Sequence, residues 1–446
     1  MTAAPLQFDV LARSGMTGAR LGRVETPHGG FDTPAFMPVG TRGSIKGVLP
    51  HLVRELGAQI VLNNTYHLML RPGSERIRAL GGVHRFMNWG GPILTDSGGY
   101  QAYSLASMNR VDDDGVTFKS IVDGKSIRLT PERAVQIQNE LGPDILMALD
   151  DCPPSVSAAG GTAGGEDIDP AQVERLRAAA RRDGVGARAG DQQARLDVAN
   201  ERTVRWLERC KAAHARPHDQ ALFGIVQGGT DLARRAWCAE RVTNVELPGY
   251  AIGGVAVGES PEAIAGVVRG TAPLLPEGKP RYLMGVGYER DILGAVLAGV
   301  DMFDCVLPTR NGRNANAFTR TGQIRLKNEK YAADPGAIEA GCDCHACDPA
   351  RYGWGGAGGG SGEGGGGAAF SRAYLRHLFA AGEMLGPILV SLHNLRHFQR
   401  FLLDIRCTVR DDDWSGLVRR WPVAAPGLVG SAVAGTDAAG IVGLSS

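Results

Sequence analysis

The sequence lacks net charge: 48 basic residues nearly balance 47 acidic ones, which leaves +1 at pH 7. A chain this close to neutral has no overall field that gathers nucleic acid, so any contact with phosphate groups must come from a local basic patch. One stretch offers such a patch, although a solvated charged face is the alternative interpretation. Its basic residues are Arg310, Arg313, Arg320, Arg325, Lys327 and Lys330, with Glu329 the one acid among them.

The sequence also lacks a run apolar enough to cross a bilayer, and its first residues show no basic region followed by an apolar one. Its eight cysteines do not form a disulfide ladder, because three cluster at Cys342, Cys344 and Cys347 and five are single. We therefore expect a cytoplasmic protein. The length of 446 residues is enough for one large domain with an appendage.

Glycine is the one residue in excess, with 63 copies, and three segments contain many of them. Residues 157–197 are rich in Ala, Gly, Arg and Asp, and we expect an insertion with a possible charged helix at 170–182. Residues 353–367 are nearly all glycine; they lack the Lys-Ser/Thr ending of a phosphate loop and are expected to be a flexible linker. Residues 423–446 are expected to form a disordered tail.

Seven short apolar runs end abruptly in polar residues or glycine, which is typical of buried parallel strands that meet loops. They span 60–64, 92–96, 145–150, 222–227, 250–254, 281–285 and 300–304. Helical segments between them begin with a hydroxyl cap, a proline and an acid, as at 130–132 and 260–262. This α/β pattern favours a closed TIM (β/α)₈ barrel over an open doubly wound sheet. We predict the barrel over residues 1–330 and a zinc-binding subdomain over 331–422.

Two of the predicted strands end in an aspartate. Asp304 is followed by two arginines within one short loop, as a catalytic acid beside an anionic substrate would be, although a lone aspartate is more often a cap or an ion-pair partner. Asp96 precedes Gly98 and Gly99, which let the backbone approach a ligand, and Tyr100, which could stack on a planar ring. Two carboxylates at one rim suit retaining chemistry at an anomeric carbon.

Asp150 and Gln227 end two further strands. The carboxylate can accept two hydrogen bonds from an amidine edge, and the amide can donate one to a carbonyl. Guanine presents both groups, so the two side chains together could recognise it. The backbone of Gly253 and Gly254 would add an N–H donor. Each residue alone is more often structural, and only the shared rim favours the functional interpretation.

Cys342, Cys344 and Cys347 place three thiols on one tight turn, where they could converge on a tetrahedral metal ion with a fourth ligand from elsewhere. His393, on a segment with helical periodicity, is the candidate. His345, His377 and His397 are its rivals. With four protein ligands the site would be closed, and therefore structural.

Several motifs together resemble the tRNA-guanine transglycosylases, also called queuine tRNA-ribosyltransferases. They are residues 33–41 (TPAFMPVGT), 64–68 (NTYHL), 94–101 (LTDSGGYQ), 223–228 (FGIVQG) and 253–259 (GGVAVGE), with the Asp304 segment and the cysteine cluster. The resemblance runs from about residue 6 to residue 404. It implies a TIM barrel with a zinc-bearing subdomain and no ATP or redox cofactor.

The resemblance also implies the reaction and the residues that perform it. Asp304 matches the nucleophile that attacks C1′ of the ribose, and Asp96 matches the proton acceptor that activates the incoming base. Matched substrate-binding positions are Asp96, Ser97, Gly98, Gly99, Tyr100, Asp150, Gln227 and Gly254. Matched RNA-binding positions are Gly285, Val286, Gly287, Tyr288, Glu289, Arg290, Asp291, Thr309, Arg310, Asn311, Gly312 and Arg313. The matched zinc ligands are Cys342, Cys344, Cys347 and His393.

The bacterial branch of the family resembles this chain at Cys152 and Val257, where the pocket accommodates an aminomethyl group. The resemblance therefore implies exchange of guanine at the wobble position of GUN-anticodon tRNAs for 7-aminomethyl-7-deazaguanine, through a covalent intermediate, by a homodimer. Val255 departs from the usual leucine. A catalytically silent tRNA-binding accessory subunit is the alternative, against which Asp96 and Asp304 argue, and a glycosidase acting on free sugars would leave the guanine-reading residues idle.

Overall fold

The structure, a computed structural model, describes residues 4–101, 109–153, 189–256, 259–352, 368–429 and 431. The predicted glycine linker at 353–367, the possible helix at 170–182 and most of the predicted tail lie outside these ranges. Val257 lies outside them as well. Among the helices in the described ranges, none combines the length and the apolar character that a membrane span requires.

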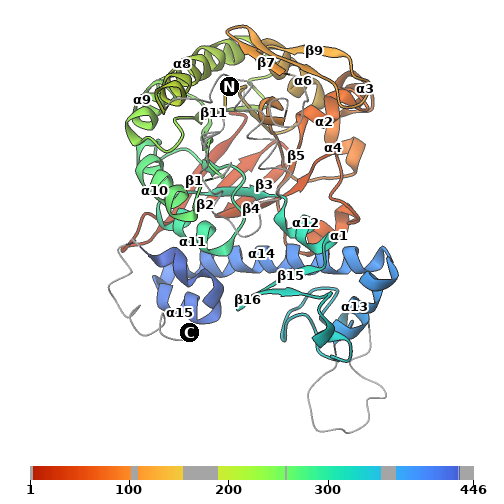
Figure 1. Cartoon of the computed structure of the whole chain (residues 1–446). Helices are drawn as coiled ribbons and strands as arrows, with labels where there is room; N and C mark the ends of the chain where they lie inside the picture. Colours follow the sequence, from red (N-terminus) through yellow and green to blue (C-terminus); the bar gives the residue numbers. More distant parts are fainter. Residues whose placement is uncertain are drawn as a thin grey trace.

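Parallel strands close into an eight-stranded barrel at the centre of the molecule (Figure 1), which confirms the predicted TIM barrel over the open sheet. Around the barrel the order is β10, β11, β12, β13, β14, β4, β5 and β6. Their bounds are β4 (Ala35–Gly40), β5 (Val61–Asn63), β6 (Ile93–Thr95), β10 (Ile145–Met147), β11 (Ala221–Val226), β12 (Gly249–Ile252), β13 (Arg281–Leu283) and β14 (Met302–Cys305).

The strand β4 was not among the seven predicted. It contains Pro38, and a proline argues against a central strand because it cannot donate a hydrogen bond to its neighbour. In the structure β4 nevertheless lies between β14 and β5, with Pro38 opposite Cys305 at the end of the pairing with β14. It completes the barrel.

Helices follow the strands and cover the barrel from outside (Figure 1). The side chains of Thr130 and Ser260 accept hydrogen bonds from the backbone of Arg133 and Ala263, which confirms both predicted helix starts. The helices between barrel strands are α1 (Pro50–Glu55), α2 (Thr65–Leu70), α3 (Ser74–Ala79), α4 (Gly82–Met87), α6 (Pro131–Leu141), α8 (Ala189–Ala213), α9 (Leu232–Thr243), α10 (Pro261–Thr271) and α11 (Glu289–Leu297).

Two small antiparallel sheets accompany the barrel. The first consists of β1 (Gln7–Arg13), β2 (Arg20–Thr26) and β3 (Gly29–Thr33), ahead of β4. The second consists of β7 (Asn109–Asp112), β8 (Gly115–Lys119) and β9 (Ser126–Leu129), between β6 and α6.

The C-terminal part lies along one side of the barrel (Figure 1). Its long helix α14 (Leu385–Asp411) packs against α12 (Leu307–Arg313), which forms where the sequence suggested a short loop after Asp304. The hairpin of β15 (Asn316–Thr319) and β16 (Gly322–Arg325) and the helices α13 (Arg372–Ala381) and α15 (Trp414–Arg420) complete this part.

The expected disorder from residue 423 does not hold for the first residues of the tail, because η4 (Pro422–Leu428) packs on α11 and buries Ala424 and Leu428. The helix α8 begins at Ala189, inside the segment 157–197 that is expected to be an insertion.

Candidate active site and metal centre

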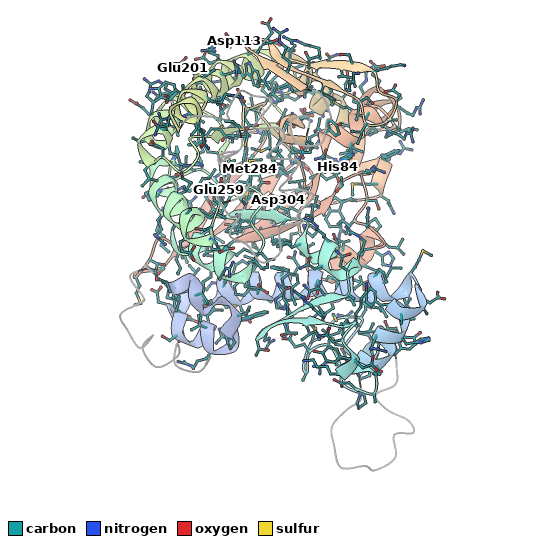
Figure 2. The ribbon with its side chains drawn as sticks, in the orientation of Figure 1. His84, Asp113, Glu201, Glu259, Met284 and Asp304 are labelled. Carbon is teal, nitrogen blue, oxygen red and sulfur yellow. The ribbon has the colours of Figure 1, made fainter. Side chains whose placement is uncertain are left out.

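The predicted site residues lie at the carboxyl ends of barrel strands. Asp96, Asp150 and Gln227 directly follow or lie just beyond β6, β10 and β11, which are neighbours in the barrel. Gly254 lies just beyond β12, and Asp304 lies near the end of β14. Because carboxyl ends of parallel strands meet at one rim, all five face the same opening. In Figure 2 the labelled Asp304 lies near the centre of the barrel, with Met284 and Glu259 close to it.

Asp304 is held through one of its two carboxylate oxygens. Its Oδ1 accepts a hydrogen bond of 2.6 Å from the hydroxyl of Tyr282 and one of 2.8 Å from the backbone N–H of Gly285. Burial raises the pKa of Asp304 above its ordinary value, and the two hydrogen bonds act in the opposite direction. No hydrogen bond from the described residues ends on Oδ2, so this oxygen is available to a substrate.

Asp96 is buried and accepts three hydrogen bonds. Its Oδ1 accepts from the backbone of Thr65 at 2.9 Å and of Gly98 at 3.1 Å, and its Oδ2 accepts from the side-chain amide of Asn64 at 2.5 Å. Burial raises the pKa of Asp96 to about 7, with a contribution from the charge of Asp304. A carboxyl group with this pKa exchanges protons near neutral pH.

Asp150 and Gln227 form a buried pair across β10 and β11. The amide Nε2 of Gln227 donates to Oδ2 of Asp150 at 2.6 Å, and the side chain of Gln227 is also hydrogen-bonded to the thiol of Cys152. Burial raises the pKa of Asp150 to about 7, and the neighbouring charge of Asp151 adds to the rise. The pair thus presents a carboxylate and an amide donor side by side.

Glycines bring the backbone close to these side chains. Gly254 has φ +65°, and a Cβ there would lie 2.1 Å from Oε1 of Gln227, so no other residue fits without moving that amide. A Cβ at Gly99 would lie 2.7 Å from Cδ1 of Leu149, next to Asp150. Ser97 accepts from the N–H of Gly99 at 3.3 Å and shapes this turn.

Tyr100 lies directly after this turn, in the described part of the chain that ends at residue 101. Burial raises the pKa of its hydroxyl above the ordinary value, so the phenol remains neutral. A neutral aromatic ring at this position is compatible with the predicted stacking platform.

Arg235, on α9, is fully buried behind the Gly253-Gly254 turn. Its guanidinium donates to the carbonyl oxygens of Gly229 at 2.7 Å and Gly253 at 2.9 Å, and more weakly to that of Gly254 at 3.3 Å. These bonds hold the turn that faces Gln227. No pattern in the sequence indicates this role, because Arg235 follows another arginine on a helix with ordinary charged residues.

Two other residues were missed. Tyr282 lies on β13, within an apolar run that predicts only a strand. Asn64 begins the motif at residues 64–68, for which the sequence indicates no role. The Oδ1 of Asn64 accepts from His67 at the start of α2, which directs its amide hydrogen toward Asp96. Their roles follow from which strands are neighbours in the barrel.

The four predicted metal ligands converge in the C-terminal part. Cys342, Cys344, Cys347 and His393 are buried, and Nδ1 of His393 lies 3.6, 3.5 and 3.4 Å from the three sulfur atoms. A tetrahedral zinc ion with Zn–S of about 2.3 Å and Zn–N of about 2.05 Å separates sulfur and nitrogen by about 3.6 Å. The four residues therefore fit a tetrahedral metal ion.

The ring of His393 is oriented for this role. Its Nε2 lies 2.7 Å from the carbonyl oxygen of Phe318, so Nε2 carries the hydrogen and Nδ1 presents a lone pair to the sulfurs. Two of the rivals have other neighbours: His345 lies 3.4 Å from Glu55, and His397 is 2.5 Å from Glu289. The third, His377, is exposed on α13.

The predicted RNA-binding positions lie on two segments that flank Asp304. Residues 285–291 lead into α11, and residues 309–313 belong to α12. Arg290, Arg310 and Arg313 are partly exposed, whereas the side chains of Val286 and Glu289 are buried and do not face solvent. The exposed arginines place positive charge beside the rim.

Comparison with known proteins agrees with this geometry. The sequence model of the family described as queuine tRNA-ribosyltransferase matches residues 14–163 and 184–425. A queuine tRNA-ribosyltransferase of Thermus thermophilus is 46% identical over 417 residues, which cover 94% of each chain. One of Nostoc is 45% identical over 410 residues, 92% of this chain and 95% of the relative. One of Oceanobacillus iheyensis is 43% identical over 408 residues, 92% and 93%.

Proposed function

Because the chain belongs to the queuine tRNA-ribosyltransferase family, a family of pentosyltransferases, we propose that it exchanges guanine at the wobble position of GUN-anticodon tRNAs for 7-aminomethyl-7-deazaguanine. The observation that carries this proposal is the pair of carboxylates at one rim, with Asp96 buried and Asp304 half-buried. Asp304 keeps Oδ2 available, and Asp96 has a pKa raised to about 7 by burial.

The reaction proceeds by two displacements. In the first, Oδ2 of Asp304 forms a bond to C1′ of the ribose while the bond from C1′ to N9 of guanine breaks, and guanine leaves with the bonding electrons and takes up a proton from water. In the second, N9 of the incoming base attacks C1′, its proton passes to Asp96, and the bond between C1′ and Asp304 breaks. Retention of configuration at C1′ follows from two inversions.

The base is read by the Asp150–Gln227 pair. The carboxylate of Asp150 accepts from the amidine hydrogens of guanine, and the amide of Gln227 turns from the thiol of Cys152 to donate to the carbonyl of the base. The N–H of Gly254 adds a backbone donor. Tyr100 provides the stacking surface. Cys152, two residues after Asp150, lies beside the base pocket. Its small side chain leaves room there for an aminomethyl substituent on the base and not for a bulky cyclopentenediol.

The arginines beside the rim, Arg310 and Arg313, contact phosphates of the anticodon loop, as their partial exposure allows. Zinc binds to the three cysteines and His393 as one closed structural ion per subunit. The active form is a homodimer in the cytoplasm, as the family resemblance and the tRNA substrate imply. Light scattering of the purified protein tests the dimer directly.

A catalytically silent accessory subunit is the competing function. It would have no need for an aspartate oriented by two hydrogen bonds or for a second carboxyl group with a pKa near neutrality, and these two features support the enzyme over the silent subunit.

The test is incubation with radiolabelled guanine and a tRNA with a GUN anticodon. We expect label to enter this tRNA and not a variant whose wobble guanine is replaced by adenine. Absence of label with folded protein, judged by circular dichroism and zinc content, would overturn the proposal.

A further inference from the structure

One buried ionic cluster lies directly behind the base-reading pair and has no role in the reaction described so far. Its centre is Asp151, the residue after Asp150, whose side chain is 2% exposed. Arg195 donates to both carboxylate oxygens, from Nη2 to Oδ1 at 2.7 Å and from Nη1 to Oδ2 at 2.9 Å. Arg202 donates to Oδ2 at 2.5 Å. The backbone N–H of Asp151 in turn donates to the hydroxyl of Thr203 at 3.1 Å.

All three partners come from one face of one helix. Arg202 and Thr203 are seven and eight residues after Arg195 on α8, about two helical turns, so the three side chains lie within one stripe roughly 100° wide along the helix. The side chains of Arg195 and Arg202 are 13% and 10% exposed. A bidentate arginine–carboxylate pair that is this well buried fixes geometry more strictly than an exposed ion pair does.

The cluster acts on a short stretch of the chain beside the base-reading pair. Asp150, Asp151 and Cys152 follow β10 without regular structure, and Asp150 and Cys152 border the proposed base pocket. A rotation of the backbone at Asp151 moves Asp150 out of line with Gln227, whose amide it meets at 2.6 Å. The position of the base-reading carboxylate therefore depends on how Asp151 is held.

Charge adds a second effect. The negative charge of Asp151 is one of the causes that raise the pKa of Asp150, after burial. Arg195 and Arg202 pair directly with Asp151, so the loss of either arginine leaves the negative charge beside Asp150 less compensated.

The outer end of the cluster is tied to a different element. The Nε of Arg202 donates to Asp113 at 3.2 Å, and the indole N–H of Trp206 donates to the backbone oxygen of Asp113 at 2.7 Å. Figure 2 labels Asp113, on the β7–β8 turn, and Glu201, on α8, at the top of the view, away from Asp304. The arginine is thereby fixed from both sides, between the β7–β8 turn and the pocket.

We propose that Arg195 and Arg202 form a clamp on Asp151 that positions Asp150 and so determines the affinity of the pocket for its base. They are positioning residues, because they contact Asp151 and not the base. The inference rests on the proposed function, which names the occupant of the pocket as a guanine-type base. It also assigns a role to Arg195, which falls inside the segment expected to be an insertion.

The chain offers a matched control on the same helix. Arg209 also makes a bidentate contact with a carboxylate, from Nε and Nη2 to Glu132 at 2.7 and 3.0 Å, but that contact ties α8 to α6 and not to the pocket. Arg195→Met and Arg209→Met thus each remove one forked arginine from α8. A purely structural contribution would affect both variants alike.

The experiment measures guanine binding by calorimetry and, separately, the KM for guanine and kcat of label exchange at saturating tRNA. For Arg195→Met we expect the dissociation constant and the KM for guanine to rise roughly 10- to 100-fold, as one misplaced charge-assisted hydrogen bond implies. The kcat should stay within about twofold of that of the original protein. Arg209→Met should bind guanine normally. Arg195→Lys, which keeps the charge and loses the fork, should lie between.

Unchanged guanine binding by folded Arg195→Met overturns the clamp, and so does an equal loss in Arg209→Met. If Arg195→Met does not fold, Arg195→Lys decides, because normal binding in that variant is also contrary to the proposal. Calorimetry separates the exchange reaction from the clamp. If the unmodified protein binds guanine but does not exchange it, the proposed reaction is refuted, and the effect of Arg195→Met on guanine binding still tests the clamp.

Discussion

Gly254→Ala tests whether the amide of Gln227 reads the base. The new Cβ would lie 2.1 Å from Oε1 of Gln227, so the amide must move and lose its 2.6 Å bond to Asp150. A hydrogen bond to a charged group contributes about 1.5–3 kcal/mol, which corresponds to roughly a 10- to 100-fold weaker affinity for guanine. Because φ is +65° at Gly254, alanine also costs the fold about 1–2 kcal/mol.

Gly382→Ala is the matched control for this strain. Gly382 has φ +75° at the end of α13, and a Cβ there would meet no atom within 4 Å. Both variants should therefore lose the stability that the left-handed backbone costs alanine, and Gly254→Ala should lose more in urea denaturation because its Cβ also disrupts the buried Gln227–Asp150 bond. Only Gly254→Ala should show a raised KM for guanine in the exchange assay. Equal KM values in Gly254→Ala and the original protein, or an equal rise in Gly382→Ala, would refute the assigned role of Gln227.

Three further predictions concern the nucleophile, the proton acceptor and the metal. Tyr282→Phe removes one of the two hydrogen-bond donors that orient Asp304. Formation of the covalent adduct should therefore slow on the order of 10- to 100-fold in single-turnover measurements, with the affinity for tRNA unchanged. An unchanged rate of adduct formation contradicts this role of Tyr282. Asp96 can accept a proton only in its ionised form, and burial raises its pKa to about 7. The exchange rate should therefore fall as the pH drops below about 7. A pH–rate profile in which the rate falls only near pH 4 contradicts this. His393→Ala should lose its metal ion and unfold more easily, while His377→Ala, a rival from the sequence, should keep one metal ion per chain by elemental analysis.

The site residues that the sequence predicted share a local signal. Asp96, Asp150, Gln227 and Asp304 each follow an apolar run, and a polar residue at the end of a buried strand is visible without knowing the neighbours. The cysteine spacing is equally local. The choice of His393 over the other histidines came from the family resemblance, and the distances to the three sulfur atoms agree with it.

The residues that the sequence missed depend on contacts between distant elements. Arg235 acts because α9 packs behind the turn at Gly253, and Arg195 acts because α8 places it over Asp151, 44 positions earlier in the chain. The strand β4 was missed for a different reason, since Pro38 argues against a strand unless its neighbours are known. A pattern within one segment does not contain this information.

The most direct test of the proposed mechanism is the covalent intermediate between protein and tRNA. The purified protein is mixed with a GUN-anticodon tRNA without free base, denatured, and separated by electrophoresis, with Asp304→Asn in parallel. We predict a slower-migrating species that carries both protein and RNA for the original chain and none for Asp304→Asn. If the protein–tRNA species persists in Asp304→Asn, Asp304 is not the nucleophile. If the original protein exchanges guanine but forms no such species, the double displacement is wrong.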